Sequence, residues 1–142
     1  MTEPIREATV DDLPHIVKMG RLFHLRAYRN LPVGYDTPTA TDFARGLIES
    51  DNGVIFISHL GMCGGLVAPF YMSTTLQASE VFWFAQDGLG DALRRRFEDW
   101  AKDKGAKVCT FSALRPVRGK AVERILKTAG YHHHETALVK VI

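Results

Sequence analysis

Three successive apolar runs lie in the middle of the chain, the first and the third rich in β-branched and aromatic residues, and they constrain the fold more than any other feature. The runs span residues 54–57, 62–68 and 80–85. The Leu60-Gly61 pair between the first two runs is typical of a tight turn, and residues 69–79 are expected to be irregular. The pattern predicts three strands in one sheet.

Helical periodicity flanks these strands on both sides. Apolar residues recur at helical spacing from Leu13 to about Tyr28, at Phe43, Leu47 and Ile48, from Leu89 to Ala101, and from Val122 to Ala129. Further strands are expected at residues 5–8 and 107–112, and two short strands are expected to close the chain, ending with residues 137–142. This order predicts an α/β (α+β) domain, with a central mixed sheet and helices on both faces.

Length and charge narrow the class of protein. The 142 residues suit a single domain over residues 1–142, and the composition, 46% apolar and 24% charged, excludes a disordered tail and a disulfide scaffold. A formal net charge of +2 gives no support for nucleic-acid binding through phosphate neutralisation. No basic segment followed by an apolar run is visible at residues 1–7, and no apolar run reaches the roughly 20 residues that a bilayer requires. A soluble, cytoplasmic protein is expected.

The cysteines and histidines give little support for a metal or redox site. Cys63 and Cys109 are expected to be reduced, buried thiols. A disulfide between them is possible only if their strands are neighbours in the sheet. The run of histidines at residues 132–134 would place adjacent side chains on opposite faces of a strand, so at most two could share a metal. No metal site is predicted. The arginines at residues 94–96 are interpreted as a charged helix face.

A strand–glycine–helix junction around Gly88-Leu89-Gly90 is the most informative segment for function. Glycine allows a sharp turn and close approach to a ligand, and the N–H groups at a helix start attract phosphate. Asp87 and Asp91 argue against an anion there, because a carboxylate suits a helix N-terminus by itself and repels phosphate. An anion site and a simple strand-to-helix turn both remain open.

Three segments in the same order resemble the GCN5-related N-acetyltransferase (GNAT) superfamily. They are the opening at residues 5–14, the segment 80–106 with its Phe-Glu-Asp-Trp-Ala-Lys stretch, and the helix at 121–131 that ends in glycine plus an aromatic residue. The segment 80–106 is also similar to short GNAT proteins encoded by tailed bacteriophages. The resemblance covers nearly the whole chain. It implies a central mixed, mostly antiparallel sheet with helices on both faces, and acetyl-CoA as co-substrate.

The resemblance also implies site residues. Gly88, Leu89 and Gly90 match the glycine loop whose main-chain N–H groups hold the pyrophosphate, although Ala85 stands where the family has Arg or Gln. Glu80 matches a carboxylate that often acts as general base at the start of the splayed strand; the alternative is a solvated strand-end glutamate. The position of the family's frequent general-acid tyrosine falls at Leu126, and Tyr131, which follows, is expected in the core.

Two functions follow from this resemblance. The first is an acetyl-CoA-dependent N-acetyltransferase acting on a small-molecule or protein amine, which would enter near the loops at residues 29–39 and 68–79. The alternative is a catalytically degenerate GNAT-like binding protein, such as a viral host-interaction or assembly factor in the host cytoplasm. The expected partners are a second copy, paired through edge strands near the C-terminus, or a host protein; no nucleic acid or membrane partner is expected.

Overall fold

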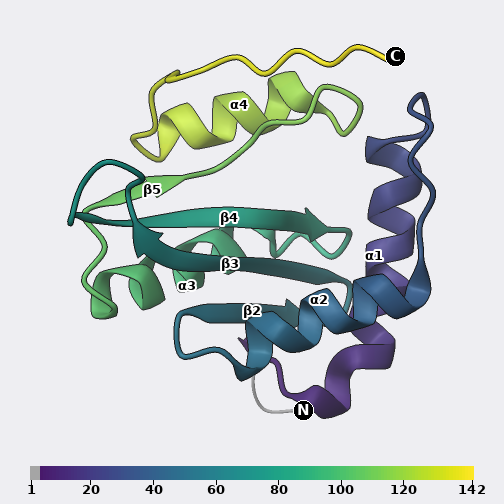
Figure 1. Ribbon diagram of the computed structural model, residues 1–142, viewed down its shortest axis with the longest axis horizontal. Helices are drawn as coiled ribbons and strands as arrows, with labels where there is room; N and C mark the ends of the chain where they lie inside the picture. The colour runs from purple at the N-terminus through teal and green to yellow at the C-terminus, as the bar shows by residue number, and fades with distance from the viewer. Residues whose placement is uncertain (1–3) are drawn as a thin grey trace.

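The computed structural model describes residues 4–142 of the chain, so residues 1–3 of the expected domain lie outside it (Figure 1). The elements, in chain order, are β1 (Arg6–Glu7), a short 3-10 helix (Val10–Asp12), α1 (Leu13–Ala27), α2 (Thr37–Glu49), β2 (Gly53–Ser58), β3 (Gly61–Pro69), β4 (Leu76–Ala85), α3 (Gly90–Asp103), β5 (Val108–Thr110) and α4 (Gly119–Thr128). Among the described residues, no helix combines the length and apolar character needed to cross a bilayer.

The five strands form one sheet in chain order, β1-β2-β3-β4-β5. The first three pairings are antiparallel and the last, between β4 and β5, is parallel. The mixed, mostly antiparallel sheet with helices on both faces confirms the predicted fold class. β5 forms an edge of the sheet, because β4 is its partner on one side and no strand follows it.

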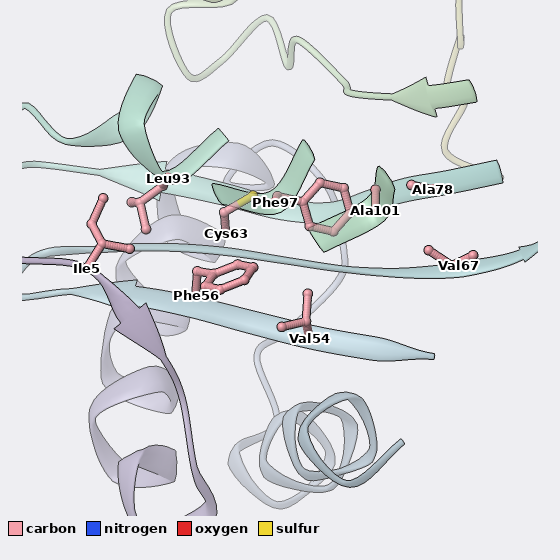
Figure 2. Close-up of a cluster of buried hydrophobic side chains, with 9 residues drawn as sticks. All are labelled: Ile5, Val54, Phe56, Cys63, Val67, Ala78, Leu93, Phe97 and Ala101. Atoms are coloured by element: carbon pink, nitrogen blue, oxygen red, sulfur yellow. The ribbon is translucent and has the colours of Figure 1, made fainter. Parts of the chain in front are cut away.

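Two hydrophobic cores cover the two faces of the sheet. On one face, Leu93 and Phe97 of α3 pack against Val54 and Cys63 (Figure 2). On the other face, α1 and α2 pack against side chains that include Ile55. β2 is buried along its whole length, so alternate side chains enter opposite cores, which explains its continuous apolar run.

The strand β4 begins earlier than predicted. Residues 69–79 were expected to be irregular, yet β4 starts at Leu76, and only residues 70–75 form the turn, closed by a hydrogen bond from Phe70 N to Thr75 O at 2.8 Å. The cause is pairing on both sides, since residues 76–79 bond to β3 and residues 77–79 also bond to β5. Tyr71 and Met72, at the tip of this turn, are each 80% exposed.

The expected strands at the end of the chain are absent from the described structure. After α4, residues 132–142 are exposed and belong to no helix or strand, and the segment runs along the outer side of α4 (Figure 1). Its alternating apolar residues favour a strand, but a strand also requires a neighbour to satisfy its backbone. The strand expected at residues 107–112 is likewise reduced to Val108–Thr110, because the chain turns away from β4 beyond that point.

Candidate functional site

A fork between β4 and β5 brings the candidate residues to one region. Residues 77–79 pair with residues 108–110, and beyond them the two chains diverge. On the other edge of β4, Gly64 pairs with Phe82 and Gly65 pairs with Glu80, so Val81 is an extra residue in a β-bulge. A bulge bends and twists a strand, which helps β4 to turn away from β5. Glu80 therefore lies at the point where the fork opens.

The carboxyl group of Glu80 is held at this point by the backbone of the opposite arm. Ser112 N donates a hydrogen bond to Glu80 Oε1 at 3.1 Å. Burial raises the pKa of Glu80 from 4.5 to about 7, and the Ser112 hydrogen bond only partly opposes the rise. Glu80 makes no ion pair with any described residue. Near neutral pH this carboxyl group exchanges a proton readily, which suits a general base.

The loop after β4 is anchored by Asp87. The Asp87 carboxylate accepts hydrogen bonds from the Ser58 hydroxyl at 2.6 Å, from Leu60 N at 2.9 Å and from Leu89 N at 3.1 Å. Burial raises the pKa of Asp87, but these bonds outweigh it and the pKa lies below its usual value. Gly88 has φ of +77°, a backbone conformation that favours glycine. Asp87 therefore fixes the glycine loop to the β2–β3 turn.

The start of α3 offers main-chain N–H groups that the rest of the described chain leaves unbound. The first helical bond is donated by Leu93 N to Leu89 O, and no described group accepts from the N–H of Gly90, Asp91 or Ala92. Leu89 N, by contrast, is bound to Asp87. Of the three predicted cofactor-binding residues, Gly90 presents an available N–H at the helix start, and Leu89 does not.

The negative charge of Asp91 is compensated by two arginines. Arg94 Nη2 lies 2.9 Å and Arg95 Nε 3.7 Å from the Asp91 carboxylate, and the buried Arg94 also pairs with Glu98. The sequence suggested that Asp87 and Asp91 would repel phosphate at this site. The structure places one carboxylate in the β2–β3 turn and the other against arginines, so both are already satisfied.

Aromatic side chains line the fork on the α3 side of the sheet. The rings of Trp83 and Phe111 meet edge to face, with centroids 5.1 Å apart, and Trp83 Nε1 donates to Gly90 O at 2.8 Å. Phe82 and Phe84 point to the opposite core. There the rings of Phe84 and Phe23 meet edge to face, with centroids 5.8 Å apart. Of the three adjacent aromatic residues in β4, Trp83 is the one that connects the fork to the start of α3.

Leu126, to which the resemblance assigns the position of the family's tyrosine, is a buried leucine of α4 and is 5% exposed. Tyr131 donates from its hydroxyl to Glu98 Oε2 at 2.8 Å and lies 3.4 Å from Cys109 Sγ. Burial raises the pKa of Tyr131 far above its usual value, so this hydroxyl gives up its proton reluctantly.

Both cysteines are free, as expected. β4 lies between their strands, so a disulfide within the chain is excluded. Burial raises the pKa of the thiols of Cys63 and Cys109, and neither is an activated thiolate. Within residues 4–142, no group of three or more His, Cys, Asp or Glu side chains could hold a metal ion.

The two loops expected to flank an acceptor amine do not lie together. The loop after α1 and the turn at residues 70–75 are at opposite ends of the β3–β4 hairpin (Figure 1). A pocket of about 250 Å³ lies between α1 and the loop that follows it. Its lining includes Arg21, His24, Arg29 and Tyr35, and no carboxylate. The expectation that both loops form one acceptor entrance is therefore wrong.

Comparison with known proteins supports the fold. No protein-family model matches the chain, and no curated protein matches its sequence. A protein described as a predicted acetyltransferase from Clostridium acetobutylicum, solved with acetyl-CoA, superposes with a TM-score of 0.75 at 13% identity over 96% of this chain and 94% of that one. An aminoglycoside acetyltransferase from an uncultured soil metagenomic sample, solved with sisomicin, superposes with a TM-score of 0.69 at 17% identity. The match covers 97% of this chain and 95% of that one.

A second metagenomic aminoglycoside acetyltransferase superposes with a TM-score of 0.70 at 13% identity, over 100% of this chain and 99% of the other. At identities this low the likeness concerns the fold and not the activity. The mixed, mostly antiparallel sheet with helices on both faces, together with these superpositions, shows that this chain has a GNAT-like fold.

Proposed function

We propose that the protein is an acetyl-CoA-dependent N-acetyltransferase that transfers an acetyl group to an amine. The observation that carries the proposal is Glu80, whose pKa of about 7 and position at the opening of the β4–β5 fork suit a general base. The same strand leads directly to the unbound N–H groups at the start of α3. A candidate base within β4 is therefore followed, one loop later in the chain, by a helix start that offers N–H groups to an anion.

The residues present fit the two ends of acetyl-CoA. The N–H groups of Gly90, Asp91 and Ala92 are available to a pyrophosphate, and Gly88 has no side chain to obstruct it. Acetyl-CoA supplies the thioester that carries the acetyl group. Main-chain N–H groups of β4 beyond the bulge are suited to polarise the thioester carbonyl, because β5 does not pair with that part of the strand.

The chemical step needs a proton acceptor. Glu80, directly or through a water molecule, removes a proton from the acceptor ammonium, and the resulting amine attacks the thioester carbonyl. The new C–N bond forms as the C–S bond breaks, and the sulfur leaves as a thiolate that takes up a proton. Leu126 has no proton to supply, so the thiolate departs without a dedicated tyrosine acid.

The cofactor half of the proposal is tested by calorimetric titration with acetyl-CoA. The wild type is compared with Gly90→Asp, which adds a carboxylate at the start of α3, and with Gly46→Asp as a matched control. A Cβ at Gly46 meets nothing within 4 Å. We expect micromolar binding by the wild type and the control and its loss in Gly90→Asp. Failure of the wild type to bind at millimolar acetyl-CoA would retire the enzyme proposal.

The contact between Trp83 and Phe111 favours the second candidate, a GNAT-like binding protein without catalysis. These rings bridge from β4 to the chain beyond β5, where a splayed strand would otherwise leave room for a ligand. An enzyme must separate them, so acetyl-CoA should change the fluorescence of Trp83 in a Trp100→Phe background. Unchanged fluorescence, together with no heat of binding, supports the binding protein.

A further inference from the structure

Positive charge is concentrated in α1 and the loop after it. Residues 13–35 contain no Asp or Glu, although the whole chain has a formal net charge of only +2. The basic residues of this stretch are Lys18, Arg21, Arg26 and Arg29. Within the described chain, none of them makes an ion pair. The flanking acids are already occupied, since Asp12 pairs with Arg6 and Asp36 accepts a hydrogen bond from Thr39 N at 3.0 Å.

Part of this stretch surrounds the pocket of about 250 Å³ described above. α1 buries Ile16 and Met19 against the sheet. Arg21, His24 and Tyr28, three and four residues apart, share a different side of the helix, and the loop after α1 packs beside them. Figure 1 shows this loop on the side of α1 that faces away from the strands. No strand residue lines the pocket, so it is separate from the β4–β5 fork.

The wall of the pocket is held in place by hydrogen bonds between α1 and the loop. Val33 O accepts from His24 Nε2 at 2.7 Å, and because a carbonyl oxygen can only accept, the proton of the ring lies on Nε2. The hydroxyl of Tyr35 donates to Val17 O at 2.8 Å. The rings of His24 and Tyr35 also meet edge to face, with centroids 5.3 Å apart. The pocket is therefore formed before any ligand arrives, as is usual for small-molecule sites.

The two arginines of the pocket keep their charge. Arg21 Nη2 donates to Thr37 Oγ1 at 2.7 Å, and the Arg21 guanidinium lies 5.1 Å from the centroid of the Tyr35 ring. Both contacts orient the guanidinium, but a hydroxyl and a ring do not neutralise it. Arg29 lines the same pocket and has no described ion pair. A guanidinium offers a fork of N–H donors that matches a carboxylate or a phosphate group.

The remaining lining gives the pocket an apolar side. It includes Leu25 and Val33, which are 58% and 54% exposed, together with Leu31. Apolar walls with a few polar groups are typical of sites that bind a small molecule. Positive charge without a carboxylate repels an ammonium group, so the pocket does not suit the acceptor amine.

We propose that this pocket binds a small anion in which a carboxylate or phosphate group is attached to an aromatic or other apolar body. The oxyanion pairs with Arg21 and Arg29, and the body lies against Leu25, Leu31 and Val33. This ligand is a third one, distinct from acetyl-CoA and from the acceptor amine. The proposal does not rest on the proposed function, because the pocket lies on the other side of α1 from the sheet.

The test is calorimetric titration of the full chain with phenyl phosphate and with benzoate, in the absence of acetyl-CoA. We expect at least one of the two to bind with a Kd below about 1 mM. Binding of phenyl phosphate alone identifies a phosphate monoester as the ligand, and binding of benzoate alone identifies a carboxylate. Arg21→Gln and Arg29→Gln should each weaken the binding by about tenfold or more, because each removes a charge-assisted hydrogen bond.

Two control variants locate the bound anion. Arg26→Gln removes an exposed arginine of the same helix that does not line the pocket, and this variant should bind as the wild type does. Gly90→Asp blocks the N–H groups at the start of α3, and it should also retain the binding. The melting temperature of each variant checks its fold.

Four results would overturn the proposal. They are no heat of binding from either anion at about 10 mM, equally tight binding of the uncharged benzyl alcohol, unchanged binding by both Arg21→Gln and Arg29→Gln, and loss of binding in Gly90→Asp. The last result would place the anion at the start of α3. A protein that binds phenyl phosphate through Arg21 and Arg29 but fails to bind acetyl-CoA rejects the enzyme alone.

Discussion

Replacing Glu80 by glutamine should make the protein more stable and less active at the same time. The structure raises the pKa of Glu80 from 4.5 to about 7 by burial, so the ionised carboxylate is disfavoured in the folded state. At about 1.4 kcal/mol per pH unit, that difference corresponds to a cost of about 3 kcal/mol at most when the group is ionised, and partial solvent access reduces it. Glutamine keeps the acceptor oxygen for Ser112 N and carries no charge.

The pH dependence has a definite sign. A carboxyl group with a raised pKa contributes its full stability below its unfolded value of 4.5, where it is protonated in both states. That contribution is lost as the pH rises from 4.5 to about 7 and stays lost above it. Glu80→Gln should therefore match the wild type at pH 4.5 and exceed it at pH 8 by about 2 kcal/mol.

The assay is urea denaturation at both pH values, followed by turnover measurements with acetyl-CoA and a panel of amines. We expect the turnover of Glu80→Gln to fall by about 10²-fold with an intact fold, and the limb of the pH–rate profile near pH 7 to disappear. Glu123→Gln is the control, because Glu123 lies half-buried on α4 and its described ion pairs are with Lys127 and His133. The stability of this variant should differ from that of the wild type by less than about 1 kcal/mol.

The outcomes separate the two parts of the reasoning. A Glu80→Gln variant with unchanged stability at pH 8 would refute the argument from burial. Unchanged turnover would refute the role of general base even if the stability rises. A variant that loses both stability and turnover would show that Glu80 acts through the structure of the fork rather than through its proton.

Further substitutions test the loop and the core. Gly88→Ala should lower the free energy of unfolding by about 1–2 kcal/mol, because φ is +77°, whereas Gly46→Ala in α2 should raise it by up to about 1 kcal/mol; urea denaturation of the pair checks both signs. Asp87→Ala should cost about 1–3 kcal/mol by leaving three donors unbound, and an unchanged urea midpoint would contradict the anchoring role. Gly65→Ala places a Cβ 2.3 Å from Ser79 O and 2.6 Å from the Phe97 ring, so calorimetry should show a melting temperature several degrees lower; a wild-type value would mean that β3 and β4 shift freely.

The class of fold and most of the helices and strands could be predicted from the amino-acid sequence. The apolar run at residues 54–57 predicts a buried strand, and the helical spacing of apolar residues from Leu89 to Ala101 predicts a helix with one buried face. β2 and α3 form at these positions, because each pattern depends only on residues close together in the sequence. The glycine junction was likewise visible, because φ of +77° at Gly88 is a local requirement of the turn.

The chemistry of the site depends on contacts between segments that are distant in the sequence. The pKa of Glu80 depends on how deeply the diverging strands bury it, and the sequence carries no measure of that burial. From the sequence, Asp87 and Asp91 are expected to repel phosphate. In the structure, the β2–β3 turn donates hydrogen bonds to Asp87, and arginines of α3 pair with Asp91. The end of the chain could not be predicted from the sequence for a similar reason. Residues 137–142 have the apolar pattern of a strand, but a strand forms only where another backbone lies beside it. The arrangement of the whole molecule determines whether such a neighbour is present.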